Sequence, residues 1–146
     1  MIVIASDHAG VDLKARILEN LRDGGYEILD LGPPDSSSVD YPDFGHKVAA
    51  AVVAGEAKAG ILICGTGIGM SMTANRHPGV RAALCHDAFT AEMARRHNDA
   101  NVLCVGARVI GGGVAEQVVE VFLNTSFEGG RHQRRVDLIE TEREDS

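Results

Sequence analysis

The sequence predicts an α/β protein built around a doubly wound parallel sheet, and three observations support this. Short apolar runs rich in β-branched residues alternate five times with longer amphipathic segments. The run at 60–64, Gly-Ile-Leu-Ile-Cys, is apolar throughout, as a central parallel strand covered on both faces should be. The 146 residues contain no internal repeat and no dividing linker, so we expect a single domain over residues 1–146.

The expected elements follow from this alternation of short and long apolar patterns. The strands are expected at 2–6, 27–31, 60–64, 80–84 and 101–105. The helices are expected at 11–23, 42–54, 69–76, 88–97 and 114–124, and a sixth begins near residue 131. Gly24 and Gly25 end the first helix, where glycine adopts a left-handed cap at low cost. A polar C-terminal tail at about 139–146 is expected to be solvated.

Composition excludes several classes of function. The net charge of −7 gives no electrostatic footprint for nucleic acid or an anionic membrane, so an anionic ligand must be held locally. The N-terminal run before Asp7 is short and lacks a basic flank, which is typical of a buried strand and not of a signal peptide. No apolar run reaches the roughly 18 residues of a spanning helix. We therefore expect a cytoplasmic protein with no nucleic-acid or membrane partner.

The three cysteines are Cys64, Cys85 and Cys104, with no CxxC pair and no Cys/His spacing typical of zinc. An odd, widely spaced set is typical of reduced thiols in a reducing compartment. Cys85 and Cys104 lie in apolar runs and are expected to be small buried hydrophobic residues. The sequence predicts no metal site.

Cys64 differs because it opens the loop Gly65-Thr66-Gly67-Ile68-Gly69, which leaves a buried strand and enters a short helix. The loop is G-x-G-x-G after the third strand, not the dinucleotide-binding G-x-G-x-x-G after the first. A P-loop needs Lys-Ser or Lys-Thr after its last glycine, and a phosphatase loop needs an arginine where Met70 stands. The spacing therefore excludes these three anion-binding loops.

What remains is a thiol beside several converging N–H groups. Such donors stabilise a thiolate, and they also stabilise an oxyanion that forms on a bound substrate. A base next to an oxyanion hole is suited to proton abstraction alpha to a carbonyl, through an enediolate. The loop alone is equally consistent with a tight strand-to-helix turn around a buried thiol, and both interpretations stay open at this point.

Polar residues elsewhere have similar alternatives. Asp7 and His8 follow the first strand at the same rim of the sheet, although Asp7 could simply cap a helix. His97 closes a predicted helix and is either a cationic cap or a general acid/base. Arg131 and Arg135 share a helix face and either clamp a phosphate or form a solvated basic end. Arg108 is a weaker candidate of the same kind.

Together these segments resemble the type B ribose-5-phosphate isomerase family, which also contains galactose-6-phosphate and allose-6-phosphate isomerases. The resemblance covers the chain to about residue 138. The matching stretches are Ser6-Asp7-His8-Ala9-Gly10, Asp40-Tyr41-Pro42, 60–69, Ala74-Asn75-Arg76, 97–103 and 128–135.

The resemblance implies a Rossmann-like three-layer α/β/α fold with a five-stranded parallel sheet, and no metal or organic cofactor. It also implies a homodimer, sometimes a tetramer, whose active sites are completed by residues of both chains. The resemblance implies that Cys64 moves the proton with Thr66 beside it, and that His97 opens the ring. The enediolate would be held by the backbone of Gly65, Gly67, Ile68 and Gly69. The sugar would be held by Asp7, His8, Tyr41 and Asn98, and the phosphate by Arg108, Arg131 and Arg135.

Three hypotheses about function follow. The first is an isomerase of ribose 5-phosphate and ribulose 5-phosphate. The second is an isomerase of another sugar phosphate: allose 6-phosphate, galactose 6-phosphate or a tetrose phosphate. The third is a non-catalytic sugar-phosphate-binding module. The presence of Cys64, Thr66 and His97, expected at one rim, favours catalysis, because a pure binder needs no thiol, hydroxyl and imidazole together.

Overall fold

A single parallel sheet of five strands forms the centre of the computed structural model, which describes residues 1–141. The strands lie in the order β2-β1-β3-β5-β4. Their bounds are Ile2–Ser6 for β1, Ile28–Asp30 for β2, Ala59–Cys64 for β3, Ala82–Leu84 for β4 and Val102–Gly106 for β5. All four strand pairings are parallel, which confirms the predicted five-stranded parallel sheet.

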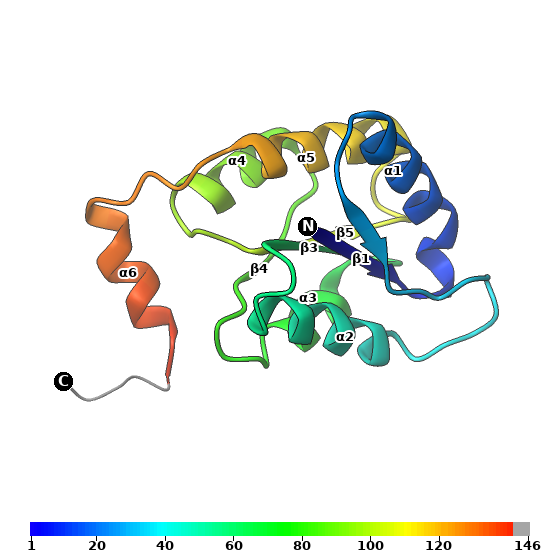
Figure 1. Ribbon diagram of the computed structural model, residues 1–146, viewed down its shortest axis with the longest axis horizontal. Coiled ribbons are helices and arrows are strands. Elements are labelled where there is room, and N and C mark those ends of the chain that lie inside the picture. The colour runs from blue at the N-terminus through cyan, green and yellow to red at the C-terminus, as the bar shows by residue number, and fades with distance from the viewer. Residues whose placement is uncertain (142–146) are drawn as a thin grey trace.

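Helices cover both faces of this sheet (Figure 1). Their bounds are His8–Gly10 for the 3-10 turn η1, Val11–Asp23 for α1, Tyr41–Val53 for α2, Ile68–Ala74 for α3, Ala88–Arg96 for α4, Gly112–Asn124 for α5 and Arg131–Ile139 for α6. Helices α1, α4 and α5 lie on one face, and α2 and α3 lie on the other. The predicted three-layer α/β/α arrangement is therefore confirmed. No helix among residues 1–141 has the length and apolar character needed to cross a bilayer.

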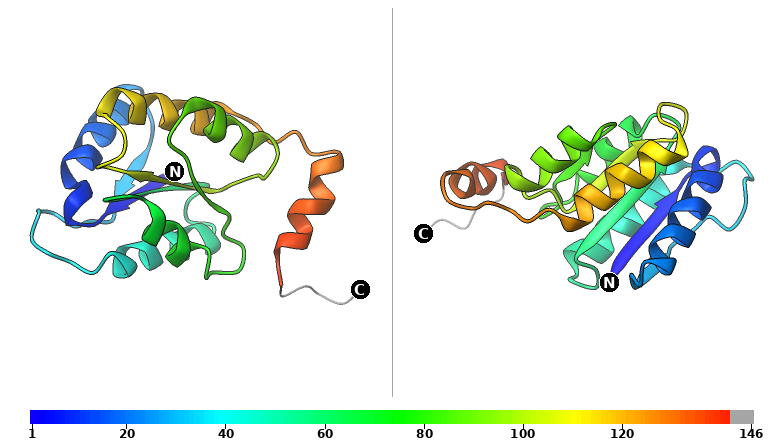
Figure 2. Two further views of the ribbon diagram at one scale, coloured as in Figure 1. Left: turned by 180° about the vertical axis from the view of Figure 1, so that it is seen from behind. Right: turned by 90° about the horizontal axis from the view of Figure 1, so that it is seen from above.

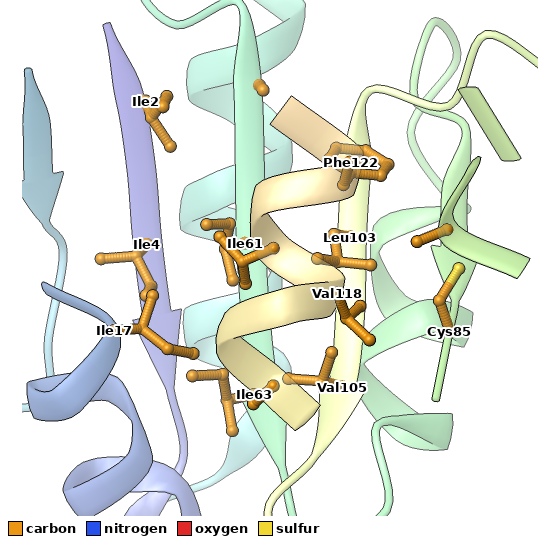
Figure 3. Close-up of a cluster of buried hydrophobic side chains, with 14 of the residues drawn as sticks. Ile2, Ile4, Ile17, Ile61, Ile63, Cys85, Leu103, Val105, Val118 and Phe122 are labelled. Carbon is orange, nitrogen blue, oxygen red and sulfur yellow. The ribbon is translucent and has the colours of Figure 1, made fainter. Parts of the chain in front are cut away.

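Two separate cores follow from the alternation of side chains along the strands. Ile2 and Ile4 of β1 face α1 and α5 in a cluster that also contains Phe122 (Figure 3). Val3, one position along, packs on the opposite face, in the cluster that contains Cys64. All six residues of β3 are buried, which confirms the prediction of a central strand.

The predicted boundaries differ from the observed ones by a few residues. Differences of two residues occur at the end of α3, at the start of α5 and at the start of β4, which begins at Ala82 and not at residue 80. The amide of Val80 donates to the carbonyl of His77 in a turn, and Asn75 pairs with both backbone groups of Ala82. Since Val80 is engaged in this turn, pairing with the neighbouring strand begins only at the Arg81 carbonyl, which accepts from the amides of Asn101 and Val102.

The last helix stands away from the three layers (Figure 2). Val136 is the one residue of α6 that is buried, whereas Leu138 and Ile139 at its end are exposed. The expected polar tail begins later than residue 139, because that residue ends α6. Glu140 is not fully solvated, since both of its carboxylate oxygens accept from the amide of Gly79. The rest of the tail, residues 142–146, lies outside the described residues.

The chain changes direction in the sheet between β1 and β3. The connection from β1 leads to β2 on one side, and the next connection returns to β3 on the other side. Ligands of such sheets bind outside the carboxyl ends of the strands at this point. The fold therefore brings the segments after β1 and β3 together at one edge.

Candidate active site

The segments that follow β1 and β3 line one cavity at the carboxyl edge of the sheet. Ser6 is paired with Ile63, so Asp7 and Cys64 come next on adjacent strands. The cavity has a volume of about 440 Å³. Its lining residues are Asp7, Tyr41, Cys64, Gly65, Thr66, Ile68, Gly69, Met72 and Arg108. Eight of these nine residues were singled out from the sequence: Asp7, Tyr41, Cys64 and Arg108 meet here with Gly65, Thr66, Ile68 and Gly69 of the loop.

Cys64 is buried at the base of this cavity, and its sulfur accepts a hydrogen bond from the loop. The amide of Gly67 donates to Sγ at 3.1 Å. Gly67 has a φ of +79°, a left-handed conformation that glycine adopts without strain. A Cβ at this position would lie 2.5 Å from the side chain of Leu84 and 2.9 Å from the carbonyl carbon of Val105. Both the conformation and the space therefore require the glycine that aims this N–H at the sulfur.

The other amides at the end of the loop belong to the first turn of α3. The first amides of a helix have no carbonyl partner within the helix. That of Ile68 is satisfied by the hydroxyl of Thr66, whose Oγ1 accepts it at 3.3 Å. The first turn of α3 therefore presents N–H groups beside a thiol, an arrangement that can hold a thiolate and a developing oxyanion together.

Two glycines allow side chains to close over the loop. A Cβ on Gly69 would lie 2.6 Å from two ring carbons of Tyr41, so the phenol ring packs directly on this glycine. A Cβ on Gly65 would lie 3.4 Å from a guanidinium nitrogen of Arg108, and the amide of Arg108 donates to the Gly65 carbonyl. Tyr41 and Arg108 thus form two walls of the cavity, one apolar with a hydroxyl and one cationic.

Asp7 and His8 have different environments although they are neighbours in the sequence. The carboxylate of Asp7 accepts from the amides of Ala9 and Gly10 at 2.9 and 3.2 Å, so it caps η1 while it lines the cavity. His8 does not line the cavity. Its Nδ1 accepts from the amide of Val39 at 3.2 Å, which puts the proton of the neutral ring on Nε2.

His97 and Asn98 lie at the opposite edge of the sheet from Cys64. His97 caps the C-terminus of α4, a few residues before β5 begins. The carbonyl of Asn101 accepts from the amide of Gly60, at the start of β3. Cys64 lies four residues further along that strand, which is about 13 Å. Within one chain, the expectation of a thiol and an imidazole at one rim is therefore not met, because β3 runs between them.

His97 contacts two residues, His132 and Glu128, that were assigned no role from the sequence. Its ring stacks on His132 with centroids 4.3 Å apart, and its Nε2 lies 3.6 Å from a carboxylate oxygen of Glu128. Burial lowers the pKa of His132, and the neighbouring His97 and Arg131 lower it further. Asn98 lines another cavity, of about 450 Å³, together with the end of α6.

Arg131 and Arg135 lie exposed on α6, away from the Cys64 cavity. They are one turn apart, as predicted, and therefore share a face. The sequence missed Met72, which lines the cavity, although it lies one helical turn after Ile68. It also missed Glu128 and His132, whose closeness to His97 depends on the turn between α5 and α6 and leaves no short spacing to detect.

Comparisons with known proteins agree with this fold and loop. Residues 2–139 match the family model described as Ribose/Galactose Isomerase. Ribose-5-phosphate isomerase B of Escherichia coli is 45% identical over 138 residues, covering 94% of this chain and 93% of that protein. A putative sugar phosphate isomerase of Bacillus subtilis, YwlF, is 50% identical over 139 residues, with 94% and 93% coverage.

Solved structures give the same result. Ribose-5-phosphate isomerase B of Clostridium thermocellum is 51% identical with a TM-score of 0.93, covering 94% of this chain and 93% of that one. The Thermotoga maritima enzyme is 48% identical with a TM-score of 0.94, covering 95% and 96%. The fold, the family model and these relatives thus define a sugar-phosphate isomerase. The chain belongs to the ribose/galactose isomerase family, among its type B ribose-5-phosphate isomerases.

Proposed function

We propose that this enzyme interconverts ribose 5-phosphate and ribulose 5-phosphate through a cis-enediolate, with Cys64 as the base. The observation that carries the proposal is the position of the sulfur, at the base of a cavity and 3.1 Å from the Gly67 amide. The substrate is taken from the relatives, which are named ribose-5-phosphate isomerases.

The reaction requires one base and a stabilised oxyanion. The Cys64 thiolate removes the proton from C2 of the open-chain aldose, and the electron pair forms the C1–C2 double bond while negative charge develops on O1. The amides of the loop between Gly65 and Gly69 hold the two enediolate oxygens, with the Thr66 hydroxyl beside them. The thiol then returns the proton to C1, the hydroxyl proton passes from O2 to O1, and O2 becomes the carbonyl of the ketose while O1 becomes a hydroxyl.

The furanose ring must open before the proton can be removed, and we assign this step to His97 of a second copy of the chain. The assignment rests on the separation of the two residues, since β3 lies between them within one chain. Asn98 lies beside His97 and would reach the same sugar. Asp7 and Tyr41 of the copy that carries Cys64 then hold hydroxyl groups of the sugar. His8 stands next to Asp7.

The phosphate is the anionic part of the substrate, and we assign it to arginines of both copies. Arg108 lines the cavity from the same chain as Cys64. Arg131 and Arg135 stand on the exposed face of α6, where a second copy can reach them. A guanidinium binds phosphate oxygens in pairs, so three arginines can hold the phosphate locally although the chain has a net charge of −7.

This division of the site makes a homodimer the smallest active unit, and a tetramer of two such dimers has the same sites. The three cysteines are unpaired and buried, as expected in the reducing cytoplasm.

The alternative substrates remain sugar phosphates with four or six carbons. A comparison of kcat/KM over tetrose, pentose and hexose phosphates tests the choice, and a higher value for a hexose phosphate would overturn ribose 5-phosphate.

The base assignment is tested with Cys64→Ala. We expect isomerisation to fall by at least about a thousandfold, while binding of sugar phosphate changes little, because the thiol acts on the proton and not on the phosphate. Cys85→Ala is the matched control, because this thiol is buried outside the cavity. Full turnover by Cys64→Ala would contradict the assignment.

The role of His97 is tested with His97→Asn. The informative measurement is the rate of ring opening in a single turnover, and we expect this rate to be lower than in the wild type.

A further inference from the structure

Three side chains that could bind a metal ion meet where α4 ends and α6 begins. His97, Glu128 and His132 each offer one ligand atom, and these atoms lie within 4.8 Å of one another. His132 and Glu128 have no part in the proposed proton transfer. The cluster was not predicted from the sequence, because Glu128 and His132 lie far from His97 along the chain and reach it only through the turn between α5 and α6.

The distances within the cluster are those of an ion site and not of direct hydrogen bonds. One carboxylate oxygen of Glu128 lies 3.6 Å from Nε2 of His97, and the other lies 3.9 Å from Nε2 of His132. Both separations are longer than a good hydrogen bond. Ligands about 2.1 Å from a tetrahedral zinc ion lie about 3.4 Å apart, so a small closure would complete the site.

The backbone holds the three residues in place before any ion binds. The amide of Glu128 donates to the carbonyl of Arg96 in the last turn of α4. Gly129 and Gly130 then adopt φ values of +67° and +56°, which turn the chain sharply into α6. The amide of His132 donates to the Gly129 carbonyl, and its ring lies nearly parallel to that of His97, at 13°.

The charges around the cluster also permit a cation. Zinc binds the neutral form of an imidazole, so the two histidines can each offer a ring nitrogen lone pair to an ion at this position. Glu128 supplies the negative charge. Arg96 binds one of its oxygens at 3.1 Å, which leaves the other oxygen for an ion. The cationic side chains of Arg96 and Arg131 weaken the affinity, which suits a reversible site.

We propose that His97, Glu128 and His132 bind one Zn²⁺ ion per chain, and that the bound ion inhibits isomerisation. Two imidazoles and one carboxylate are a donor set that zinc prefers, with water in the fourth position. An imidazole nitrogen bound to zinc cannot exchange a proton. Zinc at Nε2 of His97 therefore stops ring opening; this second part rests on the proposed function of His97.

The binding is tested with chelator-treated enzyme, by calorimetry with Zn²⁺ and by the visible absorption of bound Co²⁺. We expect one ion per chain in the wild type. In His132→Gln the affinity should fall by at least about tenfold, and the zinc concentration for half inhibition should rise by the same factor. His77→Gln is the matched control, because it removes a histidine from the exposed His46–His77 pair and should change neither value.

Other outcomes assign the ion elsewhere. Loss of zinc binding in Cys64→Ala would place the ion on the thiol and overturn the site, as would unchanged binding in His132→Gln. Zinc-loaded enzyme that turns over at the metal-free rate would overturn the inhibition. The proposed role of His97 in ring opening is tested separately, and it is overturned if His97→Asn opens the ring at the wild-type rate. The Co²⁺ spectrum of the wild type reports metal binding and does not depend on that result.

Discussion

The three thiols of this chain have different surroundings. Burial raises the pKa of Cys85 to about 11, and the carboxylate of Asp87 adds to this effect. Burial also raises the pKa of Cys104, which lies on β5 with its side chain completely buried. Cys64 instead borders a cavity and accepts an N–H hydrogen bond at its sulfur. A buried, protonated thiol is inert, so the three thiols should differ in reactivity.

We expect iodoacetamide at pH 8 to modify one thiol per native chain, at Cys64. Cys85 and Cys104 stay protonated at this pH because of the raised pKa values, and neither is open to solvent. Peptide mass spectrometry counts and locates the label. Cys64→Ala should take up none, and unfolding in denaturant should expose all the remaining thiols. Label on Cys85 or Cys104 in the folded chain would contradict the assignment.

A substitution at Gly69 tests the role of Tyr41 in the cavity. In Gly69→Ala the new Cβ would lie 2.6 Å from the Tyr41 ring, so the ring must move out of its position over the loop. We expect kcat/KM to fall by about tenfold, because the hydroxyl of Tyr41 no longer meets the sugar. Gly113→Ala is the control: this helical glycine has open space around it, and alanine should raise the free energy of unfolding by about 0.5 kcal/mol. Equal activity in both variants would remove Tyr41 from the site.

At the residue level, the sequence predicted the segments that follow β1 and β3 because a parallel sheet brings them to one edge. Cys64 and Asp7 meet there as expected. The pattern also implied that His97 lies at the other edge, because the segment between a helix and the next parallel strand is at the amino edge of the sheet. The expectation of one shared rim came from the roles that the resemblance implies, and not from the order of elements. The sequence missed His132 because stacking on His97 depends on the turn at Gly129 and Gly130.

Among the elements, the segment between β2 and α2 depends on a buried lysine of α1. Lys14 is 3% exposed, and its ammonium group donates to the carboxylate of Asp30 at 2.9 Å and to the Pro33 carbonyl at 2.7 Å. This segment then runs to Val39, whose amide holds His8, and to Tyr41 over the loop. Lys14 therefore positions one side of the cavity although it does not line it.

Lys14→Met should lower the free energy of unfolding by about 2 kcal/mol, because Asp30 and the Pro33 carbonyl lose their shared donor. We also expect KM to rise more than kcat falls, since the segment that carries Val39 and Tyr41 is held less firmly. Chemical denaturation and steady-state kinetics measure the two effects. Lys58→Met is the control, as this lysine is exposed. A stability loss with unchanged KM would leave Lys14 a purely structural role.

The sequence predicted every strand and helix, because their periodic patterns are strong. Its errors lie at the ends of elements, where turns decide. The start of β4 illustrates this: the pattern predicts a strand from residue 80, but the Val80 amide donates to His77 in a turn, and Asn75 holds the end of that turn by two side-chain hydrogen bonds to Ala82. Such side-chain hydrogen bonds between distant residues leave no periodic signal.

For the whole molecule, the position of α6 is the feature that the pattern of elements does not explain. A helix that packs on its own sheet should bury a continuous apolar stripe. In α6 Val136 is buried while Leu138 and Ile139 are exposed, and the helix stands off the three layers (Figure 2). Together with the separation of His97 from Cys64, this arrangement suits a helix that contributes to the site of a second copy.

Subunit complementation tests this arrangement. Cys64→Ala and His97→Asn chains, unfolded together and refolded, should regain about a quarter of wild-type activity. Half of the random dimers are mixed, and each mixed dimer has one intact site of two. Each variant refolded alone should remain inactive. A mixture of Cys64→Ala with Cys64→Ser is the matched control, because it can never form an intact site. Sites built within one chain would give no recovery in either mixture, since every chain of the first mixture then carries a damaged site.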